Sequence, residues 1–410
     1  MKHIISKSCA DAQAYIVPFR AGSPRSVSIT PEIDAAVDLA INGSFGGNLG
    51  ETYAMTLPAG DKLTSIILLG LGADRLSVRD IHTKAAQAFK QAKQLGARHV
   101  AIMLDQLSEL SESFELFGAL ARLPQLAGYT NSGLKSNPEN KSFEQVAFVT
   151  AADGLDAALS EAVATARGTI IARRLCNLRS NEQTPQSLAE DAAALGKEYG
   201  FDVQLFDKVA IEELGMESFL SVARGAHNTP PVLIVMRYLN GGDSPRIGLV
   251  GKGIVYDSGG YSIKTTPGMK NMFDDMGGAA AVIGAMTAVA DQKLKANVIG
   301  VIAACENKIA ADAYVPGDII GSMSGKTIEV ISADAEGRLT LADAVTYIQR
   351  KESCRFVADI ATLTGSAKTA VGKYSAAVLT NNEELYASAR EASRLSAEKI
   401  WRLDNDREML

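Results

Sequence analysis

Charged side chains that could hold metal ions stand in two groups within the hydrophobic second half of the chain. Lys252, Asp257 and Asp275 form the first group, which is rich in glycine, and Asp334 and Glu336 form the second. Asp334 and Glu336 are two positions apart, so in extended backbone their side chains point the same way. Two carboxylates that converge repel each other unless a cation lies between them. The pattern therefore indicates cations held by carboxylates.

The chemistry that this donor set favours is metal-assisted hydrolysis. Four carboxylates without a histidine or cysteine beside them suit a pair of hard or borderline divalent ions. Bridging carboxylates can hold two ions roughly 3.5 to 4 Å apart, and the ions then share a hydroxide that attacks a polarised carbonyl. Lysine is an unusual ligand because its amine must first lose a proton, but two nearby dications lower its pKa enough for that.

Each motif also has a purely structural explanation. Asp334 and Glu336 would complement the dipole of the helix predicted after them, and Lys252 would be an ordinary lysine at a strand end. The coincidence of two acidic groups, each predicted after a strand and beside glycine, favours the functional interpretation.

Two segments resemble nucleotide-binding motifs but do not match them. Residues 321–327 have three residues between their glycines instead of four, and 251–253 lacks the third glycine of the dinucleotide fingerprint.

The overall composition excludes several classes of protein. The chain has 410 residues, 47% of them hydrophobic, and no apolar run approaches the roughly 20 residues that a membrane span needs. Its 41 Lys and Arg against 47 Asp and Glu give a net charge of −6, so nucleic acid is not the expected partner. The four histidines and four cysteines are scattered, which excludes a tetrahedral Cys/His zinc site. The lack of cysteine pairing and of an N-terminal signal core predicts a cytoplasmic protein.

Alternating apolar runs and helical patterns predict an α/β fold with two domains. In the smaller N-terminal α/β domain, 1–154, a strand at 65–72, a helix at 77–95 and a strand at 99–104 form a βαβ unit. Residues 155–183 are predicted as a linker helix and junction, because an Ala-rich helical stretch ends there in a polar segment.

The larger catalytic domain, 184–410, is expected to hold a mixed central sheet covered by helices. It begins with a helix at Thr184-Pro185, where threonine is the N-cap and proline the first helical residue. Open α/β sheets bind ligands at the carboxyl ends of their strands, where both charged groups are predicted to lie. The predicted strands are 201–206, 232–238, 247–250, 298–304, 327–331 and 356–360, and the helices that intervene are 277–293 and 339–352.

Four segments of this domain are distinctive together: Val-Gly-Lys-Gly-Ile-Val-Tyr-Asp-Ser-Gly-Gly (250–260), Asp-Met-Gly-Gly-Ala-Ala (275–280), Asp-Ala-Glu-Gly-Arg-Leu (334–339) and Ala-Thr-Leu-Thr-Gly (361–365). They resemble the leucyl aminopeptidase family of dimetal exopeptidases, also called cytosol aminopeptidases. The similarity is continuous from around residue 170 onward, and the N-terminal part is similar to the family's smaller domain more loosely. Tyr261-Ser-Ile-Lys264 is similar to the peptidase B branch, whereas Ser332-Ala333 replaces the family's usual Asn-Thr. Relatives continue past Leu410, so the resemblance implies a missing C-terminal part.

The resemblance implies a role for each candidate residue. Lys264 would stabilise the oxyanion, and Arg338 would hold a bicarbonate that serves as general base. Asp257, Glu336 and Asp334 would be shared between the ions. The full set of implied metal ligands is Lys252, Asp257, Asp275, Asp334 and Glu336, and the implied walls of the pocket for the first side chain are Met272, Thr362, Leu363 and Gly365.

The resemblance also implies an activity, cofactors and an assembly. The protein would be a metalloprotease, a hydrolase that releases N-terminal amino acids from peptides with a hydroxide activated by two metal ions. Its cofactors would be two Mn²⁺ or Zn²⁺ ions per subunit, with Mg²⁺ as a further candidate, and bicarbonate. It would assemble as a homohexamer in the cytoplasm, with no membrane partner. The alternative is a non-catalytic or truncated relative with an assembly or regulatory, DNA-binding role, but the presence of every ligand together with Lys264 and Arg338 favours the enzyme.

Overall fold

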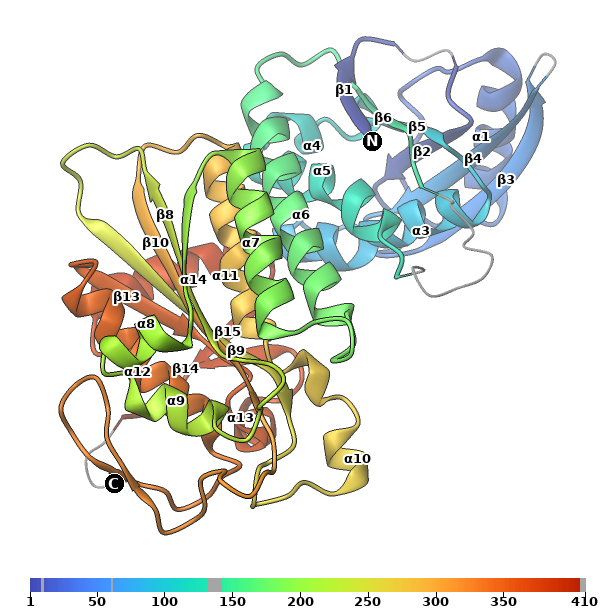
Figure 1. The fold of residues 1–410 in the computed structure, drawn as a ribbon. Helices are drawn as coiled ribbons and strands as arrows, with labels where there is room; N and C mark the ends of the chain where they lie inside the picture. Colours follow the sequence, from blue (N-terminus) through green and yellow to red (C-terminus); the bar gives the residue numbers. More distant parts are fainter. Residues whose placement is uncertain (9–10, 60–61, 132–141, 406–410) are drawn as a thin grey trace. The chain divides into compact units, whose positions relative to one another are not determined.

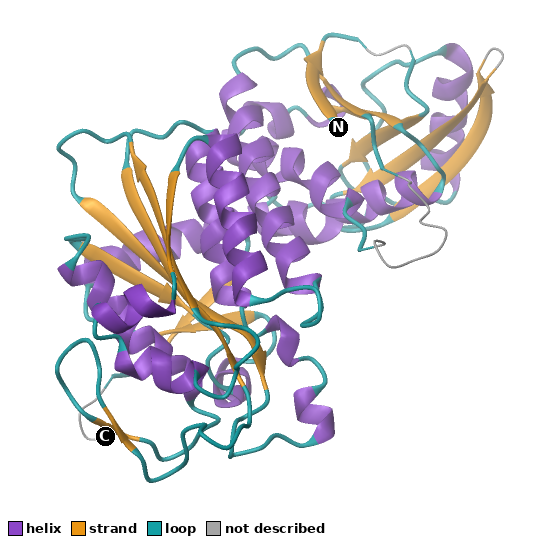
Figure 2. Cartoon of the chain, in the orientation of Figure 1, coloured by secondary structure: helices purple, strands orange, loops and turns teal. Residues whose placement is uncertain are grey.

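The computed structural model describes residues 1–8, 11–59, 62–131 and 142–405, which form two compact units. The first unit comprises residues 1–166 and the stretch from residue 370 onward, and the second comprises residues 167–369. Both are built of strands and helices, so the predicted α/β class is confirmed (Figures 1 and 2). The domain division at residues 154 and 184 stays a prediction. Within the described ranges, no helix is both long enough and apolar enough to cross a bilayer.

A six-stranded sheet in the order β1-β6-β5-β2-β4-β3 forms the centre of the first unit. Its neighbouring strands are parallel, except that β3 runs antiparallel to β4. The strands are β1 Lys2–Ser6, β2 Ala14–Phe19, β3 Thr52–Ala59, β4 Lys62–Gly70, β5 His99–Met103 and β6 Gln145–Val149. The helical segments are α1 Pro31–Gly43, α2 Val78–Asp80, η1 Ile81–Ala85, α3 Ala86–Gln94, η2 Leu104–Leu107, α4 Glu109–Glu112 and α5 Phe114–Gly128.

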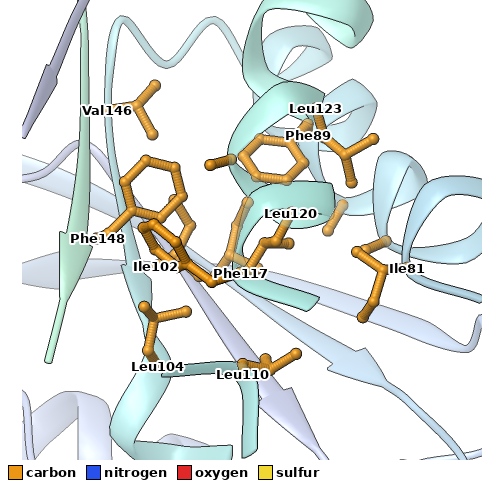
Figure 3. Close-up of a cluster of buried hydrophobic side chains, with 14 of the residues drawn as sticks. Ile81, Phe89, Ile102, Leu104, Leu110, Phe117, Leu120, Leu123, Val146 and Phe148 are labelled. Carbon is orange, nitrogen blue, oxygen red and sulfur yellow. The ribbon is translucent and has the colours of Figure 1, made fainter. Parts of the chain in front are cut away.

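Apolar side chains pack on both faces of this sheet. In β6, Val146 and Phe148 belong to the core that α3 and α5 cover, whereas Ala147 belongs to the core that contains Ile33 of α1. This division follows from the strand geometry, because successive side chains point to opposite faces. Figure 3 shows the first of these cores, in which the rings of Phe117 and Phe148 meet edge to face at 5.2 Å. The predicted strand–helix–strand elements therefore contribute to a hydrophobic core of the first unit.

A five-stranded mixed sheet in the order β13-β9-β10-β8-β7 forms the centre of the second unit. β13, β9 and β10 are parallel, and β8 runs antiparallel to both β10 and β7. The mixed central sheet predicted for the catalytic part is thus confirmed. The strands are β7 Asp202–Phe206, β8 Val232–Leu239, β9 Arg246–Asp257, β10 Asn297–Asn307 and β13 Phe356–Ile360.

Helices cover both faces of this second sheet (Figure 1). The core on one face joins the sheet to α7 and α11, and the core on the other joins it to α9 and α12. The helices are the second half of α6 (Asp156–Asn177), whose residues up to 166 belong to the first unit, and α7 Pro185–Tyr199, α8 Lys208–Glu213, α9 Glu217–Ala223, α11 Gly277–Asp291 and α12 Glu336–Arg350. Because α11 and α12 begin at the carboxyl ends of the parallel strands, their first turns lie where ligands bind in such sheets.

Local sequence signals set both ends of α7, and its start at Thr184-Pro185 is as predicted. The Thr184 side chain accepts a hydrogen bond from Ser187 N, and the Ser187 side chain accepts one from Thr184 N, which together form a capping box before Pro185. The helix ends at Gly200, whose φ of 89° is the left-handed conformation that favours glycine.

The strand predicted at 327–331 is wrong for most of its length. Only Ile328–Glu329 is a strand, β12, and it pairs with β11, Ile319–Ile320, rather than with the central sheet. Val330 is held instead by loop hydrogen bonds, because it donates to Asp318 O and accepts from Gly317 N. The remaining elements are α10 Thr266–Met269, η3 Met272–Asp274, α13 Gly365–Val371, β14 Ser375–Val378, α14 Glu383–Ser396 and β15 Lys399–Arg402.

Candidate functional site

A β-bulge near the carboxyl end of β9 brings Lys252 and Asp257 to one face of the sheet. The pairing of β9 with β10 shifts register after Ile254, which leaves Val255 as an extra residue. Residues five apart in a regular strand point to opposite faces, and the extra residue reverses that parity. The two side chains that follow the predicted strand therefore both reach the face that α12 covers.

Lys252 is buried beneath the first turn of α12 and pairs with two buried carboxylates. Its Nζ lies 2.7 Å from Asp275 Oδ2 and 2.8 Å from Glu336 Oε1, and it donates to Thr362 O at 3.2 Å. A Cβ on Gly337 would lie 2.6 Å from Lys252 Cε, so glycine leaves the room that the lysine needs. Burial opposes the lysine charge, but the two carboxylates outweigh burial and raise the pKa of Lys252.

Lys264 forms a second ion pair that joins the two groups found in the sequence. Its Nζ lies 2.7 Å from Asp257 Oδ2 and also contacts Asp334 Oδ1. Asp257 is almost wholly buried, whereas the side chain of Asp334 is 38% exposed, so the site opens to solvent on the Asp334 side. Burial again opposes the charge, but hydrogen bonds to the two carboxylates raise the pKa of Lys264.

The carboxylates of Asp257, Asp334 and Glu336 come together closely enough to hold a cation. One oxygen of each lies within 4.8 Å of the others. Glu336 Oε2 is buried, and no donor in the described part of the chain reaches it, which is costly for a charged oxygen. Burial raises the pKa of Glu336 and raises the pKa of Asp275 to about 7. The four carboxylates of the site thus carry more negative charge than its two lysines can neutralise. This donor set fits hard divalent ions.

Asp334 and Glu336 converge as predicted, but the expectation of extended backbone between them is wrong. Ala335 has φ −109° and ψ 32°, and Glu336 is already the first residue of α12. A turn into the helix, rather than a strand, therefore aims the two carboxylates. The sequence predicts a helix from 339 onward, where the apolar pattern starts, whereas the structure begins the helix at Glu336, a predicted ligand.

The other predicted residues lie around these ion pairs to different degrees. Thr362 Oγ1 donates to Asp275 Oδ1 at 2.7 Å, so this predicted pocket residue also orients a predicted ligand. Arg338 is exposed in the first turn of α12, and Met272 is half-buried in η3. Leu363 and Gly365 are exposed in the segment that follows β13.

Asn307 is a residue of this site that the sequence patterns did not single out. It is the last residue of β10, it is fully buried, and its Nδ2 donates to Asp257 Oδ1 at 2.8 Å. The signal that could have found it was its place at the end of a parallel strand, since such strands end at the same edge of a sheet as the ligands.

Comparison with known proteins identifies the family to which this geometry belongs. The family model described as "Cytosol aminopeptidase family, catalytic domain" matches residues 170–410, and the model of the same family's N-terminal domain matches residues 33–138. The chain belongs to the cytosol aminopeptidase family. A probable cytosol aminopeptidase of Clostridium perfringens is 41% identical over 98% of this chain and 83% of its own length. One of Fusobacterium nucleatum is 40% identical over 88% and 73%.

Solved structures agree with this cytosol aminopeptidase assignment. A tomato leucine aminopeptidase mutant superposes with a TM-score of 0.86 at 29% identity and covers 100% of this chain and 82% of its own. The bottromycin maturation enzyme BotP, solved in complex with Mn, has a TM-score of 0.82 at 27% identity and covers 96% and 82%. The resemblance drawn from the four motifs is therefore confirmed, and membership of the family makes this chain a peptidase, which is a hydrolase. The findings do not favour the non-catalytic alternative.

Proposed function

We propose that this cytosol aminopeptidase releases N-terminal residues from peptides at a centre of two divalent ions. The ligands would be the five residues predicted from the sequence, Lys252, Asp257, Asp275, Asp334 and Glu336. The observation that carries the proposal is the convergence of Asp257, Asp334 and Glu336 within 4.8 Å, together with a buried Glu336 Oε2 that no donor in the described part of the chain reaches. Bound divalent ions would supply Lewis-acid polarisation of the scissile carbonyl and a lowered pKa for attacking water.

The protein's own side chains would bind and orient the substrate around that centre. The Lys264 ammonium lies beside Asp257 and Asp334, where it would face the negative charge that develops on the carbonyl oxygen. Arg338, exposed in the first turn of α12, would hold bicarbonate as the general base, since a helix N-terminus favours anions. Met272, Thr362, Leu363 and Gly365 would form the pocket for the first side chain.

We also propose the finer properties that the family resemblance implies. The ions would be Mn²⁺ or Zn²⁺, with Mg²⁺ as a further candidate, and the protein would be a cytoplasmic homohexamer. The mass of the native protein in solution tests the hexamer directly.

Hydrolysis of leucine p-nitroanilide by the purified protein tests the proposed activity. We expect turnover that rises when Mn²⁺ is added to metal-free protein and disappears with a chelator. The chelated protein should keep its circular dichroism spectrum, so that loss of metal is distinguished from unfolding. Turnover that a chelator leaves unchanged, or a folded and metal-loaded protein with no turnover, would contradict the proposal.

Metal affinity is expected to rise with pH across neutrality. Burial raises the pKa of Asp275 from 3.8 to about 7, and its two neighbouring carboxylates raise the pKa of Lys252 despite burial. A metal ion must displace the protons from both groups, so binding releases protons and tightens from pH 6 to pH 8. Calorimetric titration of Mn²⁺ in buffers of different ionisation heat measures both effects, and an affinity that is the same at pH 6 and pH 8 would contradict the expectation.

The same raised pKa has a consequence for the stability of the metal-free protein. The folded state holds the Asp275 proton more tightly than the unfolded chain does, so the contribution of Asp275 to the free energy of unfolding falls as the pH rises from about 4 to about 7. Denaturant titrations of metal-free protein across this range measure the pH dependence of stability independently of any activity.

A further inference from the structure

We propose that Asn307 is a positioning residue for the metal centre, which sets the carboxylate of Asp257 and ties the Asp257 segment to the Asp334 segment. This inference rests on the proposed function, because it concerns the same ligands. It assigns a role to a residue that belongs neither to the sequence motifs nor to the proposed substrate pocket.

The amide of Asn307 bridges the two segments that carry the converging carboxylates. Its Nδ2 donates to Asp257 Oδ1 at 2.8 Å and to Ala333 O at 3.0 Å. Both partners are acceptors, so the NH₂ group must be the end of the amide that faces them. Ala333 directly precedes Asp334 in the sequence, and Tyr314 Oη donates to the same carbonyl at 2.7 Å. One buried side chain thus fixes the spacing between the two ligand segments.

Asn307 also decides which oxygen of Asp257 is free to meet a cation. Asp257 Oδ1 accepts two hydrogen bonds, from Asn307 Nδ2 and from Gly259 N at 2.9 Å. These two donors fix the plane of the carboxylate and leave Oδ2 directed at the charged groups of the site, where Lys264 Nζ lies 2.7 Å away. Partners of this kind, which hold a ligand by its other atom, tune metal affinity in many sites.

The backbone of Asn307 holds the same loop from a second direction. Its carbonyl accepts from Ser258 N at 3.0 Å and from Ser258 Oγ at 2.7 Å. After the bulge in β9, Asn307 and Asp257 are direct partners in the sheet register. A Cβ on Gly260, whose φ is 56°, would lie 3.0 Å from Asn307 Oδ1, so the loop packs tightly against the amide. The position and orientation of the amide are therefore determined by the fold.

A role in packing alone does not explain an asparagine at this position. Asn307 is fully buried, and its Oδ1 has no hydrogen-bond partner in the described part of the chain. A buried polar atom without a partner lowers stability, and an apolar side chain would avoid that cost. What an amide provides, and an apolar side chain would not, is the two hydrogen bonds that Nδ2 donates to the ligand segments.

The test is the Mn²⁺ affinity of metal-free protein, measured by calorimetry for Asn307→Ala. We expect the affinity to fall about 10- to 100-fold, the range found when a partner of a metal ligand is removed. The matched control is Asn297→Ala, at the other end of β10. Asn297 is also a buried asparagine, and its Nδ2 donates to Gly242 O and Ser244 O at 2.9 and 2.8 Å. Asn297→Ala should lower the unfolding midpoint but leave Mn²⁺ affinity within twofold of the parent.

The outcomes separate this inference from the proposed function. A parent protein that binds no Mn²⁺ overturns both. A parent that binds Mn²⁺ while Asn307→Ala binds it within twofold overturns the positioning role alone, and so does an equal loss of affinity in Asn297→Ala. If Asn307→Ala does not fold, Asn307→Ser is measured instead, because the serine hydroxyl fills part of the cavity that alanine would leave. Parent-like Mn²⁺ affinity in that variant would equally refute the role.

Discussion

Replacing Asp334 with asparagine is expected to abolish metal binding and peptidase activity together. Asp334 is one of three carboxylates that lie within 4.8 Å of one another, and its side chain is the most exposed of the three. An amide keeps the size of the side chain but removes the charge that attracts a hard cation. We expect Mn²⁺ affinity to fall more than about 100-fold and kcat/KM to fall at least about 10³-fold, which is about 4 kcal/mol. Metal content after desalting and leucine p-nitroanilide hydrolysis measure the two losses.

The control for Asp334→Asn is Asp318, a half-exposed acid directly before β11. Asp318 accepts a hydrogen bond from Val315 N at 3.0 Å and makes no ion pair with the lysines of the site. Asp318→Asn should keep metal content and turnover near those of the parent. An Asp334→Asn protein that retained both would remove Asp334 from the ligand set, and with it the proposed centre.

Sequence patterns predicted the elements of the second unit well where local and tertiary preferences agree. The helix at Thr184-Pro185 carries its own cap, and the strand at 298–304 is apolar because both of its faces are covered. The segment 327–331, Thr-Ile-Glu-Val-Ile, is also rich in β-branched residues, but only Ile328 and Glu329 pair with another strand. Whether a short apolar run joins a sheet depends on which edge is free to receive it, and that is decided by parts of the chain far away in sequence.

The rule that parallel strands end at one edge of their sheet predicted that the Asp257 and Asp334 groups would meet, and the structure brings them together through Lys264. The rule holds for Asp257, which ends β9, but not for Asp334, because the short strand before Asp334 does not join the central sheet. The bulge at Val255 could not be predicted, since nothing in its neighbours distinguishes an extra residue from a regular one. Asn307 was missed because the predicted strand ends at 304, whereas β10 continues to Asn307, and because its role depends on a hydrogen bond across strands.

The ion pairs refine what Lys264 is expected to do. Its ammonium contacts Asp257 Oδ2 and Asp334 Oδ1, which are two of the oxygens proposed to bind metal. In metal-free protein the lysine therefore neutralises part of the charge that the ions would neutralise. The hydrogen bonds raise the pKa of Lys264, so its ion pairs stabilise the folded state at neutral pH, and this contribution is lost only as the pH rises through the raised pKa.

Lys264→Ala is accordingly expected to separate catalysis from metal binding. Turnover of metal-loaded protein should fall about 10²- to 10³-fold, the usual cost of removing a group that stabilises an oxyanion. Mn²⁺ affinity should stay the same or rise, because a competing cation is gone, while the metal-free protein should unfold at a lower denaturant concentration. Single-turnover kinetics, calorimetry and denaturant titration measure these three quantities.

The control for Lys264→Ala is Lys270→Ala, since Lys270 is an exposed lysine at the end of α10 in the same segment. It should change none of the three quantities appreciably. If Lys264→Ala kept full turnover, the oxyanion role would be wrong. If it instead lost its metal together with its turnover, Lys264 would be holding the ligands in place rather than acting on the substrate. Only a loss of turnover with metal retained fits the proposed role, in which Lys264 pairs with the two carboxylates in metal-free protein and stabilises the oxyanion when the ions are bound.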